Sequence, residues 1–199
     1  IPMQVKVEKQ YPIPTSVEQA WRILSDVPDL AACMPGADLN EKLDERHYKG
    51  NIKIKVGPVT AAFGGEIEVL GVDIAAKTIR LQGKGSDKGG SSASMDLVAT
   101  LKGGGQSGAC VLVGSADVIV NGKFAQFGGR MLNSVTDMVL DQFAENFSAK
   151  AAALQPTAGT DTLRAPPPHG QLNALTIVWQ LLKDFLAGLL GRKKHDAAD

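Results

Sequence analysis

The sequence predicts an α+β fold in which a curved antiparallel sheet wraps around one long helix, with a further amphipathic helix at the C-terminal end. From Ala37 to Asn121, short runs of alternating apolar and polar residues are separated by Gly-rich turns, as in antiparallel sheets. After this region the apolar period changes to that of a helix, over Lys123–Ala153. At about 1.5 Å per residue this helix is roughly 40 Å or more long, which is enough to cross the sheet.

The first 36 residues predict one strand and two short helices. Apolar and polar residues alternate from Met3 to Glu8, as in a half-buried strand. Thr15 or Ser16 can cap the helix that follows. A second short helix is expected over Pro28–Met34, where Pro35-Gly36 ends it.

The region after these helices predicts strands joined by short turns, so that the sheet has six or seven strands in all. The Gly57-Pro58 pair marks one of the turns. The runs with the clearest alternation are His47–Val56, Val59–Val72, Thr78–Gly83, Ser91–Leu101 and Ala109–Val120.

Composition excludes several classes of protein. The 199 residues carry 21 Lys and Arg against 21 Asp and Glu, so the chain lacks the excess of positive charge typical of nucleic-acid binding. A hydrophobic content of 44% argues against general disorder. The low number of cysteines, two, argues against a disulfide scaffold and favours a reducing compartment. The first residues contain no continuous apolar stretch like that of a signal peptide, so a cytoplasmic location is expected.

No catalytic residue, metal site or tightly held cofactor is predicted. His47, His169 and His195 lie far apart, without metal-ligand spacing. The run Gly103–Gly108 fits the G-x-G-x-x-G pattern, but it lies between two predicted strands and is better interpreted as a hairpin loop. Cys33 has no Cys or His near it in sequence and is expected to be a small buried hydrophobe.

The inward faces of the predicted strands and of the long helix are apolar and carry no charge. A sheet that grips a helix can leave a cavity between them, and an uncharged cavity suits an apolar ligand. The same pattern is equally that of a filled core without a cavity. The residues expected to line the interior are Tyr48, Ile52, Ile54, Phe63, Ile67, Leu81, Met95, Leu97, Leu112, Phe127, Met131 and Val135.

Three parts are expected along the chain: a ligand-binding domain over residues 1–153, a linker over 154–170 and a terminal helix over 171–195. The linker carries four prolines, at positions 156 and 166 to 168, and is therefore expected to be extended and semi-rigid. The apolar side of the terminal helix is expected to face the membrane, and basic residues are expected to bind the membrane surface at the C-terminal end of this helix. The predicted membrane-binding residues are Leu175, Val178, Trp179, Leu182, Phe185, Leu186, Leu189, Arg192, Lys193 and Lys194.

The terminal helix is expected to lie in the interface of an anionic membrane rather than to cross it. The apolar run Leu172–Leu190 has 19 residues, about the minimum for a span, but Lys183 and Asp184 interrupt it. A charge near the centre of a span costs roughly 2.5–3.5 kcal/mol, which an interfacial helix avoids. Docking on a partner enzyme or on its own domain, and a true tail anchor, are the alternatives.

Two local motifs stand out near the start of the chain: Trp21–Asp26, and the stretch Pro28–Gly36, in which a short helix and a cysteine precede a Pro-Gly turn. Both resemble the CoxG family of carbon monoxide dehydrogenase subunits, which is part of the START-like, SRPBCC superfamily with the helix-grip fold. The hairpin at Gly57-Pro58-Val59 and the glycines between residues 122 and 129 are also similar to that family. The resemblance covers about residues 3–150.

The resemblance implies a non-catalytic accessory protein of a molybdenum hydroxylase, with aerobic carbon monoxide dehydrogenase as the expected partner. It also implies recruitment of that enzyme to the inner face of the cell membrane, and a respiratory quinone as the hydrophobic ligand. Two alternatives remain at this stage. One is an enzyme similar to polyketide cyclases and aromatases, which needs acid and base groups that face the cavity. The other is a membrane adaptor without a ligand.

Overall fold

A computed structural model of the protein describes residues 1–105 and 108–154. Their order is strand, two short helices, six strands, a 3-10 turn and a long helix. The elements are β1 (Met3–Ile13), α1 (Val17–Leu24), α2 (Val27–Cys33), β2 (Ala37–Lys42), β3 (His47–Val56), β4 (Val59–Asp73), β5 (Thr78–Ser86), β6 (Ser92–Gly103), β7 (Cys110–Asn121), η1 (Gly122–Phe127) and α3 (Gly128–Ala153).

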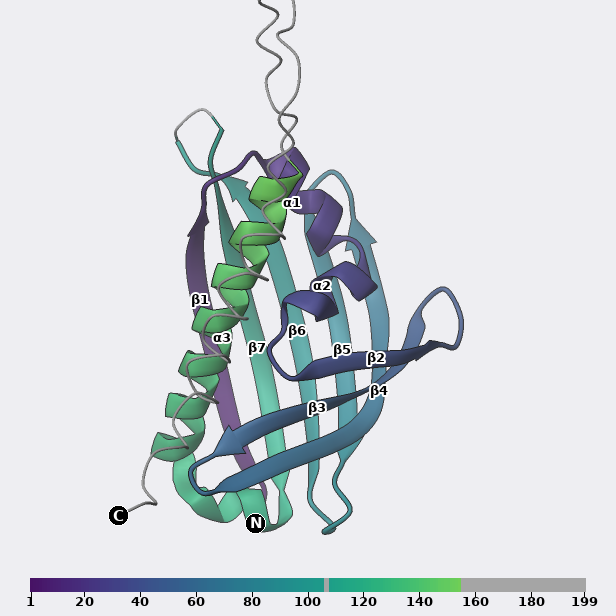
Figure 1. Ribbon diagram of the computed structural model, residues 1–199, viewed down its shortest axis with the longest axis vertical. Coiled ribbons are helices and arrows are strands. Elements are labelled where there is room, and N and C mark those ends of the chain that lie inside the picture. The colour runs from purple at the N-terminus through teal and green to yellow at the C-terminus, as the bar shows by residue number, and fades with distance from the viewer. Residues whose placement is uncertain (106–107, 155–199) are drawn as a thin grey trace, which may run out of the picture. The chain divides into compact units, whose positions relative to one another are not determined.

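The seven strands form one antiparallel sheet in the order β1-β7-β6-β5-β4-β3-β2. Each strand from β2 to β7 pairs with its neighbour in sequence, and β1 joins the sheet beside β7. Figure 1 shows that β2 and β3 run across the direction of β5, β6 and β7, so that the sheet curls strongly. The predicted α+β fold with a curved sheet and a long helix is confirmed.

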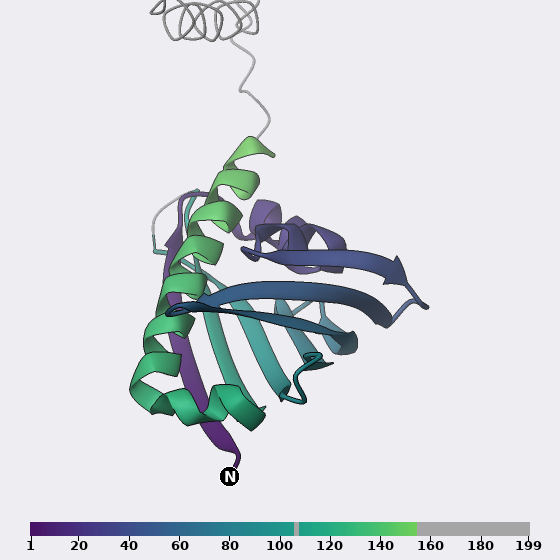
Figure 2. The same cartoon turned by 60° about the horizontal axis from the view of Figure 1, so that its bottom comes forward.

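Small residues lie in register across the sheet where it curls. Gly50 of β3 is paired with Gly65 of β4, which is paired with Gly85 of β5, and Gly85 is opposite Ala93 of β6. Glycine in a strand permits a tight bend and a close approach of neighbouring backbones. These positions alternate with outward-facing residues, so the row also leaves the concave face without large side chains. Figure 2 shows this concave face beside α3.

A side chain caps each of the two short helices, as the sequence predicts for the first of them. The Ser16 Oγ accepts a hydrogen bond of 3.3 Å from the Gln19 amide, which selects Ser16 over Thr15 as the cap of α1. The Asp26 carboxylate accepts one of 2.9 Å from the Asp29 amide at the start of α2. The predicted second helix is shifted by one residue, to Val27–Cys33.

The predicted helix over Lys123–Ala153 is wrong at its start. Residues Gly122–Phe127 form a 3-10 turn, and α3 begins only at Gly128. Gly128 has a φ of 77°, a left-handed conformation that a continuous right-handed helix excludes. Phe124 and Phe127 therefore lie on the turn before α3, although the helical spacing of the sequence placed them on the helix.

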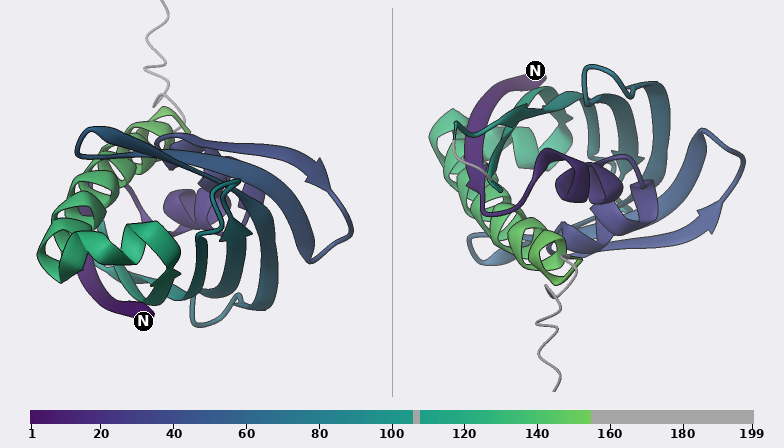
Figure 3. Two further views of the ribbon diagram at one scale, coloured as in Figure 1. Left: turned by 90° about the horizontal axis from the view of Figure 1, so that it is seen from below. Right: turned by 90° about the horizontal axis from the view of Figure 1, so that it is seen from above.

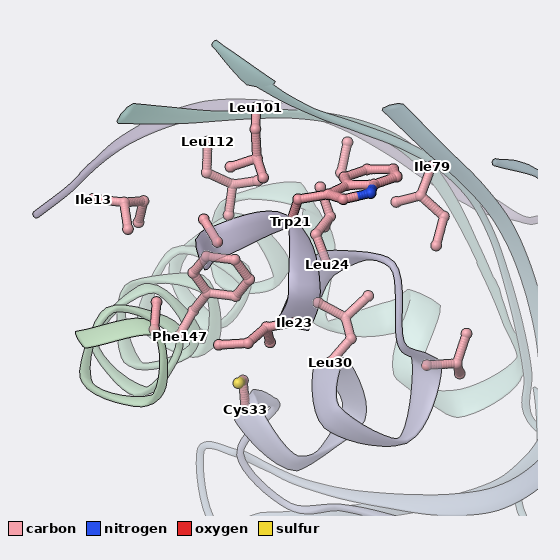
Figure 4. Close-up of a cluster of buried hydrophobic side chains, with 14 of the residues drawn as sticks. Ile13, Trp21, Ile23, Leu24, Leu30, Cys33, Ile79, Leu101, Leu112 and Phe147 are labelled. Atoms are coloured by element: carbon pink, nitrogen blue, oxygen red, sulfur yellow. The ribbon is translucent and has the colours of Figure 1, made fainter. Parts of the chain in front are cut away.

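The main hydrophobic core lies between the sheet, α1, α2 and the C-terminal half of α3. Figure 4 shows Trp21 and Leu24 of α1 between the sheet and the neighbouring helices, with Phe147 of α3 beside them. Phe147 and Ile79 have no exposed surface. Cys33 is also part of this core, as expected, with 1% exposure.

Polar contacts hold α3 to β1 near the middle of the helix and to α2 near its C-terminal end. On the side of β1, Lys9 Nζ lies 2.7 Å from Asp137, and the Tyr11 hydroxyl donates a hydrogen bond of 3.1 Å to Asp141. Near its C-terminal end, Lys150 Nζ lies 2.7 Å from Asp29 of α2. The helix thus crosses the concave side of the sheet along β1, as Figure 3 shows from below and above.

Candidate ligand-binding site

The interior contains a second, smaller hydrophobic cluster at the end of the domain away from α1 and α2. Its buried residues are Val56, Ala61, Val120 and Phe124. The concave face is therefore closed by α1 and α2 at one end and by η1 at the other, with α3 along its side. Partly buried apolar residues pack against this second cluster: Ile54, Phe63, Val118, Phe127, Met131 and Val135.

The structure divides the twelve predicted lining residues into groups. Tyr48, Leu81 and Leu112 are at most 8% exposed and belong to the main core. Ile67 and Leu97 are partly buried and pack against that core. Ile52 and Met95 are partly buried and belong to neither cluster. The remaining five, which pack against the second cluster, are Ile54, Phe63, Phe127, Met131 and Val135.

The lining residues near the second cluster face inward and yet remain partly exposed. Ile52 and Ile54 alternate with exposed residues and share their face with buried Val56. Water therefore reaches side chains that lie on the concave side, so this half of the interior is less completely filled than the main core. Elsewhere on the concave face, Gly83 leaves space between Ile67 and Met95, its neighbours in the sheet. The Met95 methyl group occupies part of that space, 3.6 Å from where a Gly83 Cβ would lie.

The concave faces of β3 to β7 carry no charged side chain in the described residues. The ionisable groups that the sequence reasoning missed lie on β1, where Lys9 and Tyr11 share the inner face. Both are engaged with α3. Burial, followed by the hydrogen bond to Asp141, raises the pKa of Tyr11 to about 12. In the sequence, Lys9 and Tyr11 continue the period of two that Val5 and Val7 begin, and this pattern could have placed them on the inner face.

The turn η1 closes one end of the interior with aromatic rings. Phe124 is 2% exposed, and its ring centroid lies 5.5 Å from that of Phe63 and 6.0 Å from that of Phe127. Lys123 Nζ lies 2.8 Å from Asp87 in the β5–β6 turn, and the hydrogen bond between them lowers the pKa of Asp87. This ion pair ties η1 to the sheet.

A shallow, open groove of about 370 Å³ lies between the β3–β4 hairpin and α3. It is lined by Lys55, Gly57, Met131, Ser134, Val135 and Met138. Met131 and Val135 also pack against the second cluster, so the groove and the interior share two side chains.

Within residues 1–105 and 108–154, no three His, Cys, Asp or Glu side chains are grouped as metal ligands would be. Burial raises the pKa of the thiols of Cys33 and Cys110, which disfavours a reactive thiolate. In the same part of the chain, no helix has the length and hydropathy that a bilayer span requires. The linker, and the terminal helix with its predicted membrane-binding residues, lie outside the described residues.

The family model for CoxG, a subunit of carbon monoxide dehydrogenase, matches residues 10–152. No curated protein sequence matches the chain.

Solved structures match over most of the described domain. A conserved protein from Geobacillus kaustophilus has a TM-score of 0.67 at 23% identity and covers 75% of this chain and 96% of its own. The Zhui aromatase/cyclase from Streptomyces sp. R1128 has a TM-score of 0.56 at 14% identity, covering 79% and 99%. Truncated norcoclaurine synthase from Thalictrum flavum has a TM-score of 0.54 at 16% identity, covering 78% and 96%. At these identities the likeness shows a shared helix-grip fold, and nothing about activity.

Proposed function

The chain belongs to the CoxG family of carbon monoxide dehydrogenase subunits, and from this membership we propose that it is a non-catalytic accessory protein of a molybdenum hydroxylase. In this role it carries a hydrophobic ligand in the interior and couples the enzyme to the inner face of the cytoplasmic membrane. Carbon monoxide dehydrogenase is the first partner to test, because the family description names it.

One observation supports the ligand most directly: the inward-facing residues around the second cluster are apolar, uncharged and only partly buried. In the main core, by contrast, most inward-facing side chains are buried, and only a minority such as Ile67 and Leu97 are partly exposed. An apolar ligand that packs against Ile54, Phe63 and Phe127 would remove their remaining surface from water, at roughly 25 cal/mol per Å².

A respiratory quinone is the ligand we infer. Its ring is flat and its tail is a hydrocarbon, so both parts suit an uncharged interior. A quinone also accepts electrons, and a molybdenum hydroxylase releases electrons when it oxidises its substrate. A carrier between that enzyme and the membrane would connect the two, with the C-terminal helix as its peripheral membrane anchor.

Native mass spectrometry of the full chain, purified gently from its own membranes and followed by organic extraction, tests the ligand. The expected result is one quinone per chain. Ile54→Glu places a charge among the partly buried lining residues and should abolish the bound quinone. Ile119→Glu is the matched control, because Ile119 lies on β7 with 39% exposure, and this variant should retain the ligand.

A wild-type protein that is folded and empty, and that still binds membranes and the enzyme, would reject the carrier and leave an adaptor without a ligand. Loss of quinone from both isoleucine variants would reject the interior as its place. Turnover of an aromatic or polyketide substrate by the purified protein would favour the enzyme alternative.

A further inference from the structure

One surface of the folded domain combines exposed apolar side chains with lysines that have no acidic partner. It consists of the tip of the β3–β4 hairpin and the facing side of α3, which lie side by side in Figures 1 and 3. We refer to it as the hairpin surface, and its residues are Lys53, Lys55, Val59, Met131, Val135 and Met138.

Two of the apolar side chains of the hairpin surface are open to water. Met138 is 57% exposed and Val59 is 38% exposed, although both are large hydrophobic residues. Met138 lines the open groove of about 370 Å³ together with Lys55 and Gly57 of the hairpin. The Met131 methyl group lies 3.0 Å from where a Gly57 Cβ would be, so the hairpin tip and α3 approach closely at its floor.

The two charged residues of the hairpin surface are both lysines. Lys53 and Lys55 are exposed on the outer face of β3, opposite Ala62 and Thr60, and neither forms an ion pair within the described residues. Lys49 on the same strand differs, because it lies opposite Glu66. The acids of the adjoining part of α3 do not neutralise these lysines, since Asp137 bonds to Lys9 of β1.

We propose that the hairpin surface is a second membrane contact, through which the folded domain itself binds an anionic bilayer. Lysines beside exposed apolar side chains suit the surface of such a bilayer. The charges reach the anionic headgroups, and the apolar groups enter the boundary of the acyl chains. This contact is independent of a bound quinone and of the C-terminal helix. It orients the domain with Met131 and Val135, which also pack against the second cluster, toward the lipid.

Site-specific fluorescence on the full chain tests this contact. Met138→Cys provides one reactive surface thiol, because the native Cys33 and Cys110 are each 1% exposed. An environment-sensitive label there should shift to the blue on vesicles of phosphatidylcholine and phosphatidylglycerol, and lipids brominated on their acyl chains should quench it. The same label on Ser115→Cys, exposed on the outer face of β7, should report water throughout.

The lysines are tested with the same label. The variant Lys53→Gln/Lys55→Gln should lower the labelled protein's affinity for these vesicles by about fivefold per lysine. The matched control Lys84→Gln/Lys102→Gln removes two exposed lysines from β5 and β6 and should leave the signal at residue 138 unchanged.

Several outcomes would overturn the proposal. One is a protein that binds the vesicles while its label at residue 138 stays in water, because the terminal segment alone would then hold it. Another is a label shielded before vesicles are added, which would mean that another segment or a second copy covers the surface. A third is a response to the partner enzyme and not to vesicles, which would assign the surface to a protein interface.

Discussion

Gly65 of β4 lies directly opposite Gly85 of β5, and the two backbones are so close that a Cβ on Gly65 would lie 2.6 Å from the Gly85 Cα. No real side chain tolerates that distance, so the strands can meet in this way only if residue 65 is glycine. The pair stands in the row of small residues where the sheet curls toward α3. The curl brings β3 and α3 together, so the interior depends on this contact.

We expect Gly65→Ala to destabilise the fold by about 1–3 kcal/mol or more, because the methyl group collides with backbone atoms that cannot move independently. Gly71→Ala on the same strand is the matched control, since its Cβ would meet no atom within 4 Å. It should change the free energy of unfolding by less than about 1 kcal/mol. Urea unfolding followed by circular dichroism measures both. Equal losses would contradict the role of close approach at Gly65.

Substitutions of two phenylalanines are expected to differ in their effects on stability and on ligand binding. Phe147 has no exposed surface, and Phe147→Ala should cost about 3–5 kcal/mol of unfolding free energy. Phe127 is only partly buried, so Phe127→Ala should cost about 1–2 kcal/mol. The second variant should nevertheless lose bound quinone, as followed by extraction. If it keeps the quinone, Phe127 is not part of the lining.

His47 is expected to titrate above its usual value of 6.5, because its hydrogen bond to Asp44 raises its pKa. The stability gained from its proton is complete below the unfolded pKa, near 6.5, and is lost as the pH rises through the folded pKa. The Arg46 amide, and then the His47 ring, lower the pKa of Asp44, so the carboxylate's contribution is lost as the pH falls through that lowered value.

An NMR pH titration of the imidazole protons measures the pKa of His47 directly. In Asp44→Asn it should move back toward 6.5, although the nearby Glu68, 3.8 Å from Nε2, retains part of the shift. An identical His47 titration in both proteins would rule out Asp44 as the cause.

The link between α2 and α3 should depend more on a neutral hydrogen bond than on an ion pair. The Asn146 side-chain amide donates a 2.9 Å hydrogen bond to the Cys33 carbonyl in a partly buried position, so Asn146→Ala should cost about 1–2 kcal/mol. Lys150 and Asp29 are 34% and 48% exposed, so Lys150→Met should cost at most about 1 kcal/mol. Thermal unfolding at low and high salt measures both, and only the lysine variant should reduce the salt dependence.

The alternation of apolar and polar residues was sufficient to predict most strands and the face that each presents to the interior. It located His47–Val56 to the residue, because one buried face makes the pattern strict. The start of α3 was predicted wrongly, since Phe124 and Phe127 have helical spacing whether or not the helix continues through Gly128. The positive φ of Gly128 does not change the spacing of the apolar residues, so the pattern could not reveal it.

Local patterning was also enough to identify the residues that face inward and the absence of charge on the concave faces of β3 to β7. It could not distinguish the inward-facing residues that are buried in the core from those that stay partly exposed on the concave face. Leu81 and Ile54 have the same strand pattern, yet Leu81 lies in the core that α1 and α2 cover, and Ile54 lies in the less filled half. A period of two distinguishes one face of a strand from the other, whereas burial depends on segments that are distant in the chain.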